Sequence, residues 1–289
     1  MLFSSLRPSH WIKNILVFTA LVVSHSYQDP EKVTKALSAF VIFCMSASAV
    51  YLLNDFLDKK YDRSHSIKRL RPIASGEIST FVIWLMLSLL LVVSLVLSHW
   101  LLNNKFIFIL ITYLALTTIY STHLKRIAIL DIILLSFFYN LRILAGAYAI
   151  SVEPTSWLLS FSLFFFTSLA LMKRFNEIFL DEQQSILNSR GYQVDDKPFM
   201  SSFGIASAIA SVVVLAFYIN DTHASEMYHT PEIIWALCPI LLYWTMRMWL
   251  LSLRGRMTED SILFAIKDPT SLVCGLLTII TLVMARIVI

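Results

Sequence analysis

Four oxygen-bearing side chains that suit a hard metal ion follow one another at helical spacing. Asn54, Asp58 and Asp62 recur every four residues, and Asp55 lies beside the first of them. On a helix these side chains share one face, where three carboxylates repel one another unless a cation lies among them. Carboxylate and amide oxygens suit Mg²⁺, which usually also binds phosphate oxygens of a substrate. The pattern therefore predicts an Mg²⁺ site formed by Asn54, Asp55, Asp58 and Asp62.

The alternative interpretation of this acidic segment is a solvated helix end. It suits Asp62, which has basic neighbours. It suits Asn54 and Asp55 less well, because both follow a long apolar run and should lie near a membrane boundary. Polar side chains are costly there without a partner. The metal site is therefore the favoured interpretation.

Basic residues follow the acidic segment directly. Arg63, Lys68, Arg69 and Arg71 occur within a few residues of Asp62. Cations beside a metal-type acidic cluster form a cradle for a polyphosphate, and arginine can bind its oxygens with two hydrogen bonds. The alternative is the ordinary excess of basic residues in cytoplasmic loops, or attraction to anionic lipid, which accounts for some of these cations.

Two ionisable residues fall inside an apolar run further along the chain. Asp131 and Arg142 lie eleven residues apart, an offset that places both on one helix face with Phe138. Ionisable groups inside a membrane are presumptive functional groups that face a cavity. Structural pairing with other helices is the alternative.

The surrounding elements predict an all-α, polytopic membrane protein. The 289-residue chain is 57% hydrophobic and only 15% charged, whereas soluble domains average about 25% charged residues. Long apolar runs alternate with short polar loops, and each run approaches the ~20 residues that cross a bilayer as a helix. The nine predicted spans are Ile12–Tyr27, Val33–Phe56, Thr80–Trp100, Phe106–Tyr120, Ile127–Ile150, Thr155–Met172, Met200–Asn220, Pro231–Leu251 and Pro269–Ile289.

Charge asymmetry predicts the orientation of these spans. Most of the 23 Lys and Arg residues lie in the amino-terminal segment and in loops near 57–79, 121–126, 173–199 and 252–268. The opposite loops hold only Lys32, Lys35, Lys105 and Arg286. The positive-inside rule therefore predicts a cytoplasmic amino terminus, a carboxyl terminus on the far side of the inner membrane, and catalytic loops on the cytoplasmic side. We expect residues 1–289 to form a single transmembrane domain.

The acidic motif and the following Arg71-Pro72-Ile-Ala-Ser-Gly76 resemble the UbiA-type intramembrane prenyltransferase superfamily. The resemblance implies nine helices around a central cavity. It also implies that two aspartate-rich motifs bind a prenyl diphosphate through Mg²⁺. In this chain the place of the second motif reads Lys173-Arg174-Phe-Asn-Glu177, so cations replace one acidic cluster.

That departure makes the chain similar to the decaprenyl-phosphate phosphoribosyltransferase branch of the superfamily. The similarity rests also on Arg7-Pro8-x-x-Trp11-x-Lys13-Asn14, on Tyr120-Ser121-x-x-Leu124-Lys125, on Asp131 with Arg142 and Gly146, and on Arg254-Gly255 with Asp268. The implied reaction moves 5-phosphoribosyl from phosphoribosyl pyrophosphate to a polyprenyl phosphate and releases pyrophosphate, with Mg²⁺ as cofactor, in cell wall biosynthesis.

The resemblance and the residue patterns together give the expected site. Catalysis is assigned to Asp55, Asp58 and Asp62. Substrate binding is assigned to Lys13, Asn14, Asn54, Arg63, Lys68, Arg71, Tyr120, Lys125, Asp131, Arg142, Lys173, Arg174 and Glu177.

Two other functions remain open from the sequence. One is a prenyltransferase that moves a prenyl group from prenyl diphosphate to an aromatic or other small acceptor. The other is an ion-coupled transporter or flippase, although polar loops on one side and few prolines or glycines within the spans argue against it. The expected partners are phosphoribosyl pyrophosphate, a polyprenyl phosphate lipid and the membrane, with no nucleic acid. The oligomeric state stays open.

Overall fold

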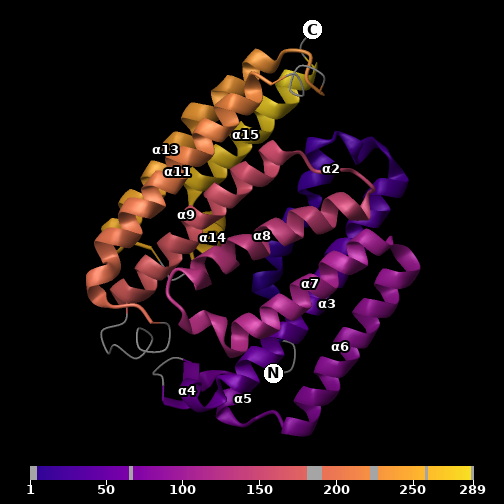
Figure 1. Cartoon of the computed structure of the whole chain (residues 1–289), viewed down its shortest axis with the longest axis vertical. Helices are drawn as coiled ribbons and strands as arrows, with labels where there is room; N and C mark the ends of the chain where they lie inside the picture. Colours follow the sequence, from indigo (N-terminus) through magenta and orange to yellow (C-terminus); the bar gives the residue numbers. More distant parts are fainter. Residues whose placement is uncertain (1–4, 65–67, 181–190, 222–226, 258–259, 288–289) are drawn as a thin grey trace. The chain divides into compact units, whose positions relative to one another are not determined.

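The computed structural model describes residues 5–64, 68–180, 191–221, 227–257 and 260–287, and over these ranges all regular structure is helical (Figure 1). The chain forms two compact units. The first comprises Met1–Lys125 with Phe138–Pro154, and the second comprises Arg126–Phe137 with Thr155–Ile289. Helix α8, Leu130–Ala149, contributes its first residues to the second unit and the rest to the first.

The first unit is built around α3. Helix α3 packs against α6 and α7 and against the amino-terminal helix η1 (Figure 1). Apart from α8, the other helices of this unit are short and connect these elements. The bounds in chain order are η1 Pro8–Phe18, α2 Thr19–Val23, η2 Ser26–Gln28, α3 Pro30–Leu57, α4 Lys59–Ser64, η3 Lys68–Leu70, α5 Pro72–Ser75, α6 Thr80–Leu101, α7 Asn104–Thr122 and η4 Leu124–Arg126.

The second unit is a bundle in which α11 packs against α9 and α13, and α13 packs against α15 (Figure 1). The bounds are α9 Ser156–Leu180, η5 Val194–Asp196, α11 Lys197–Ile219, η6 Pro231–Ala236, α13 Leu237–Leu253, α14 Ser261–Lys267 and α15 Pro269–Ile287. The side chain of Trp249 on α13 lies against Gly204 of α11, where a β-carbon would stand 2.0 Å from the indole ring. The glycine therefore permits the close contact of these two helices.

The all-α membrane fold predicted from the sequence is confirmed. Within the described residues, eight helices are long and apolar enough to cross a membrane. The first predicted span is the exception, because Pro8–Val23 is a shorter apolar helix. Most of it is a 3₁₀ helix, which rises ~2.0 Å per residue and so extends η1 and α2 together to about 30 Å. The nine segments predicted from hydropathy thus correspond to eight full spans and one shorter helix.

The 3₁₀ conformation matches η1 to its neighbour α3. Three residues of a 3₁₀ helix rise ~6 Å, as do four residues of an α-helix. Trp11 accordingly donates to the Ser48 hydroxyl at 2.9 Å, and Asn14 donates to the Cys44 thiol at 3.3 Å. Steps of three on one helix thus meet steps of four on the other. This register brings the polar side chain of Asn14 into the interior, where only 1% of it is exposed.

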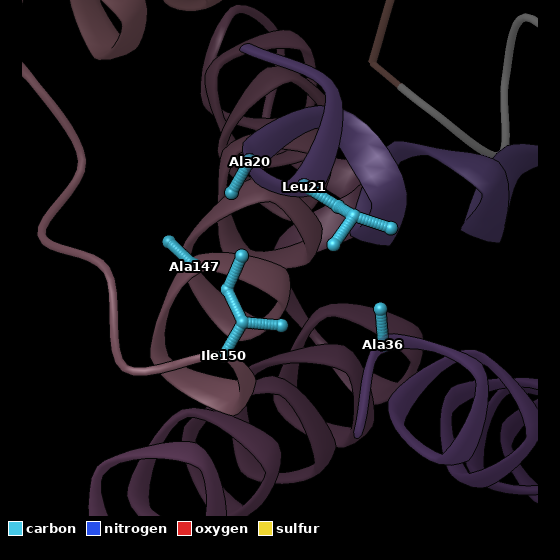
Figure 2. Packing of buried hydrophobic residues seen from close by; sticks show 5 residues of the cluster. All are labelled: Ala20, Leu21, Ala36, Ala147 and Ile150. Carbon is cyan, nitrogen blue, oxygen red and sulfur yellow. The ribbon is translucent and has the colours of Figure 1, made fainter. Parts of the chain in front are cut away.

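Small residues allow the far end of η1 and α2 to pack closely on the rest of the first unit. Figure 2 shows Ala20 and Leu21 of α2 against Ala36 of α3 and the end of α8. A β-carbon on Gly146 would stand 1.8 Å from the Val17 carbonyl oxygen, so only glycine permits this approach. Packing between helices in a membrane depends on such close contacts rather than on hydrophobic burial.

Candidate active site

The acidic segment begins where α3 ends. Asp58 is the cap of α3, and α4 starts at the next residue, yet Asp62 N–H still donates to the Asp58 carbonyl at 2.8 Å. The helical hydrogen bonding therefore passes through the break. The side chains have different partners: Asp55 and Asp62, two turns apart, share one cation, whereas Asp58 contacts another.

Asp55 and Asp62 share one guanidinium group. Nη1 of Arg71 lies 3.3 Å from Oδ1 of Asp55 and 2.7 Å from Oδ2 of Asp62. Arg7, which precedes η1, also donates to Oδ1 of Asp55. Both carboxylates are buried, each residue being 5% exposed. Arg7 was part of the motif recognised in the sequence, but its contact with Asp55 was not predicted.

The loop that carries Arg71 is fixed by Arg63. Nε of Arg63 donates to the Ala74 carbonyl at 2.9 Å, and this ties α4 to the short helix α5. Gly76 ends α5 with a φ of 89°, a left-handed conformation that glycine adopts without strain. Arg63, predicted to bind substrate, therefore has a positioning contact in this structure.

The third aspartate has a different partner. Nζ of Lys125, in η4, lies 2.7 and 2.9 Å from the two carboxylate oxygens of Asp58. The two side chains are more exposed than the Asp55 group, at 15% for Lys125 and 36% for Asp58. The residues 125 and 58 are far apart in sequence, and the structure brings these two predicted site residues together.

The acidic residues fit a cation between Asp55 and Asp62. Their oxygens lie within hydrogen-bonding reach of a single nitrogen atom, so a positive group already occupies the position between them. Hard oxygen ligands of this kind suit Mg²⁺. In the described part of the chain, no three acidic, histidine or cysteine side chains converge on one point. Asp55 and Asp62 are thus the two acids that converge on one positive group, while Asp58 contacts Lys125.

Arg142 is a buried cation with neutral partners. Its Nε donates to Oδ1 of Asn14 at 2.9 Å, Nη1 to the Phe138 carbonyl at 2.6 Å, and Nη2 to the Tyr113 hydroxyl at 3.1 Å. The guanidinium also lies 5.0 Å from the centre of the Tyr113 ring. Arg142 is only 5% exposed, and no described carboxylate pairs with it. An uncompensated charge within a membrane span is costly and indicates a function.

A second charged cluster lies in the second unit. Nε of Arg174 donates to Oδ2 of Asp131 at 2.6 Å, and Nη1 of Arg174 donates to Glu177. Arg174 and Asp131 are almost completely buried, at 1% and 0% side-chain exposure. The sequence Lys173–Glu177 was expected to open a loop, and this expectation is wrong because α9 continues to Leu180. The helix places Arg174 and Glu177 one turn apart, so that they pair.

Tyr192 completes this second cluster and was not predicted. Its hydroxyl donates to Oδ1 of Asp131 and accepts a hydrogen bond from the Ile129 N–H at 2.9 Å. Burial, and then the neighbouring Asp131 carboxylate, raise the pKa of Tyr192 above its ordinary value of 10.0, so the hydroxyl stays protonated. Nothing in the sequence pairs this tyrosine with an aspartate 61 residues away.

Asp268, which directly precedes α15, forms a further ion pair with Arg247 of α13. Two nitrogens of Arg247 lie 2.6 and 2.9 Å from the two Asp268 oxygens, and the Ser271 N–H donates to Asp268 at 2.8 Å. Hydrogen bonds from Arg247, and then from Ser271, lower the pKa of Asp268 from 3.8 to about 2. The carboxylate thus caps α15 and compensates the one basic residue of α13.

This ion pair predicts how stability depends on pH. Because the pKa of Asp268 is lowered by folding, its contribution is present above about pH 4 and is lost as the pH falls towards about 2. Asp268→Asn keeps a capping side chain but loses the charge. We expect the melting temperature in detergent to fall more steeply for the wild type than for Asp268→Asn over this range. Parallel melting curves would show that the pair contributes nothing.

The remaining predicted residues occupy varied positions. Lys13 is buried, and Tyr120 packs its ring 5.4 Å from that of Phe138. Lys173 is half-buried on α9. Asn54 is half-buried, and its side chain makes no hydrogen bond to the described residues. The side chain of Lys68 lies outside the described residues.

The chain is similar to several known proteins. An uncharacterised protein from Sinorhizobium fredii is 35% identical over 98% of this chain, which spans 55% of that protein's length. The nodulation protein NoeC from Azorhizobium caulinodans is 32% identical over 93% of this chain and 87% of its own. A decaprenyl-phosphate phosphoribosyltransferase from Mycolicibacterium smegmatis is 34% identical over 73% of this chain and 68% of its own.

Solved structures and a family profile agree with the fold. A UbiA homologue from Archaeoglobus fulgidus, solved with GPP and Mg²⁺, matches with a TM-score of 0.69 at 17% identity, over 97% of this chain and 96% of that chain. At this identity the match shows the fold alone. The profile of the UbiA prenyltransferase family matches residues 15–267. The chain is therefore a multi-pass membrane protein that belongs to the UbiA prenyltransferase family.

Proposed function

We propose that this protein transfers 5-phosphoribosyl from phosphoribosyl pyrophosphate to a polyprenyl phosphate and releases pyrophosphate, with Mg²⁺ as cofactor. The observation that carries the proposal is the buried Asp131–Arg174–Glu177 cluster. Prenyltransferases that the chain resembles hold their diphosphate with two acidic motifs. In this chain the position of the second motif carries Arg174, which pairs with the buried carboxylates of Asp131 and Glu177. The similarity to the Mycolicibacterium smegmatis phosphoribosyltransferase supports the same conclusion.

The proposed chemistry needs no strong base. An oxygen of the polyprenyl phosphate, already ionised, forms the new bond to C1 of the ribose as the bond from C1 to the pyrophosphate oxygen breaks. Bound Mg²⁺ would supply neutralisation of the charge that develops on the departing pyrophosphate. Asp55 and Asp62 would hold the ion. Arg7, Arg71 and Lys125, at 22%, 31% and 15% side-chain exposure, would bind phosphate oxygens.

Arg142 gives this proposal a second support. Both proposed substrates carry a phosphomonoester, and a buried guanidinium with neutral partners can bind one without first leaving a carboxylate. Asn14, its hydrogen-bond partner, contacts Cys44, which lies ~16 Å along α3 from Asp55. Arg142 is therefore placed for a phosphate other than the departing pyrophosphate. Lys13, Asn54, Tyr120, Lys173 and Glu177 stay predicted substrate-binding residues.

Replacing Arg142 with methionine should separate stability from activity. Arg142→Met strands no carboxylate but removes a hydrogen-bond donor from three buried oxygens, so we expect the free energy of unfolding to fall by only about 1–3 kcal/mol. Loss of a charge-assisted phosphate contact should lower kcat/KM by roughly 10- to 100-fold. Melting temperature and steady-state kinetics with each substrate varied in turn measure the two effects. A large fall in melting temperature with unchanged kinetics would assign Arg142 a structural role.

The orientation of the protein also belongs to the proposal. We place the amino terminus and the loops near 57–79, 121–126, 173–199 and 252–268 on the cytoplasmic side of the inner membrane, because basic residues gather there. The carboxyl terminus then lies on the opposite side. We propose that residues 1–289 function together as a single transmembrane domain. Phosphoribosyl pyrophosphate would reach the acidic cluster from the cytosol.

A labelled-donor assay tests the proposed function. Purified protein in detergent receives Mg²⁺, polyprenyl phosphate and phosphoribosyl pyrophosphate labelled in the ribose. We expect label in the lipid phase and release of pyrophosphate, both abolished by EDTA. Product that forms only with prenyl diphosphate and 4-hydroxybenzoate would instead identify a conventional prenyltransferase. Ion-driven uptake by reconstituted vesicles without a covalent product would identify a transporter.

A further inference from the structure

Every aspartate of the acidic segment is paired with a cation that the proposed function assigns to phosphate. Arg71 bridges two of the carboxylates, and the other two cations each contact one. The three aspartates are thus paired with three cations. The members of this group, here called the paired cluster, are Asp55, Asp58, Asp62, Arg7, Arg71 and Lys125.

When a metal ion or a phosphate enters the paired cluster alone, one charged side chain of the cluster loses its oppositely charged partner. A metal ion between Asp55 and Asp62 displaces Arg71 and leaves its guanidinium without a carboxylate. A phosphate on Arg71 leaves Asp62 without a cation and leaves Asp55 with Arg7 alone, and both aspartates are only 5% exposed. Unpaired charges at such burial are costly. When both ligands enter together, each displaced group finds a new partner.

We infer that the metal ion and the diphosphate bind this protein as a coupled pair, with the Arg71 guanidinium holding the metal position until both arrive. The inference rests on the proposed function only in that the site takes a metal-bound diphosphate. Such coupling is reciprocal, so each ligand raises the affinity for the other by the same factor. The coupling restricts binding to the metal-loaded donor.

Of the three cations in the paired cluster, Arg71 is the one whose side chain can most easily change partners. Both of its bonds to described residues come from Nη1, which leaves Nη2 and Nε available for phosphate oxygens. Its side chain is 31% exposed, the most of the three cations. Arg7 is held more firmly, because its guanidinium also lies 5.4 Å from the centre of the Tyr51 ring. The contact from Arg63 to the Ala74 carbonyl keeps the backbone after Arg71 in place during the exchange.

Metal binding without phosphate tests this inference. Mn²⁺ is titrated into the purified full-length protein in detergent, and free Mn²⁺ is measured by electron paramagnetic resonance. Arg71→Gln should bind Mn²⁺ about tenfold more tightly than the wild type, because the carboxylates lose their internal cation. Arg69→Gln is the matched control, since it removes the same charge from an exposed position of the same loop. Arg71→Lys keeps the charge and should resemble the wild type.

Phosphate binding without metal supplies the reciprocal test. With EDTA present, pyrophosphate should bind Asp62→Asn about tenfold more tightly than the wild type, because Arg71 loses its shorter carboxylate contact, of 2.7 Å. The same substitution should weaken Mn²⁺ binding. Melting temperatures identify any variant that has not folded. If Arg71→Gln does not fold, Arg71→Lys still tests whether a positive charge at this position is enough to preserve wild-type metal affinity.

Two results would overturn the inference. Equal gains in Mn²⁺ affinity for Arg71→Gln and Arg69→Gln would reveal only long-range electrostatics. Unchanged affinity in both would show that Arg71 does not hold the metal position. These binding results are independent of turnover. Coupled binding without phosphoribosyl transfer would refute the proposed function alone, and transfer without coupling would refute this inference alone.

Discussion

Asp55→Ala should lower the turnover of phosphoribosyl transfer by about 10²-fold or more. Loss of one preorganised charge-stabilising group typically costs this much. Asp55 has more cationic contacts than Asp58 or Asp62, since Arg7 and Arg71 both donate to its Oδ1. Its removal takes away a metal ligand and also leaves Arg7 without that carboxylate. Turnover is measured with labelled donor at saturating Mg²⁺, polyprenyl phosphate and phosphoribosyl pyrophosphate.

The same helix offers a control for Asp55. Asp29 caps the opposite end of α3, where its side chain accepts hydrogen bonds from the Glu31 and Lys32 N–H groups. Asp29→Asn removes one acidic charge from α3 and retains the capping bonds. We expect this variant to keep wild-type turnover. Turnover of Asp55→Ala within threefold of wild type would exclude Asp55 from the metal site.

Arg174→Met should destabilise the protein by about 3–5 kcal/mol. The substitution leaves Asp131 and Glu177 without their shared cation, and breaking a buried ion pair from one side typically costs this much. Asp131 is completely buried, so water cannot solvate its charge when Arg174 is removed. Thermal unfolding in detergent should show a fall in melting temperature of roughly 10 °C.

A double-mutant cycle identifies the cause of this loss. Asp131→Leu combined with Arg174→Met removes both members of the Asp131–Arg174 pair and should be less destabilising than the sum of the two single changes. Arg256→Met serves as control, because it makes the same substitution at an exposed arginine of the same unit. A normal melting temperature for Arg174→Met with lost activity would show that Arg174 serves phosphate and not its internal partners.

Together, Arg174 and Arg142 show why burial alone does not assign a role to an arginine. Arg174 has two carboxylate partners, so its removal strands negative charge. Arg142 has an amide, a carbonyl and a phenol, so its removal strands none. The first is expected to act on stability and the second on substrate binding. Both lie on apolar helices, and their hydropathy patterns do not distinguish them.

The helices and the position of the acidic segment could be predicted from the amino-acid sequence. A backbone that crosses lipid must satisfy its hydrogen bonds within each segment, so long apolar runs specify helices without reference to the rest of the fold. The acidic residues can likewise be identified from the sequence, because they directly follow the apolar run of α3. The UbiA family could be recognised from that one segment and the motif at Arg71.

The pairing of the charged side chains could not be predicted from the sequence. Lys125 reaches Asp58 across 67 residues, and Tyr192 reaches Asp131 across 61. No local periodicity encodes such pairs, because they depend on how separate helices pack. The 3₁₀ conformation of η1 has the same origin, since it matches the spacing of contacts on α3. Local hydrogen bonding fixes a membrane helix, whereas the partner of a buried charge is fixed by the neighbours that packing brings to it.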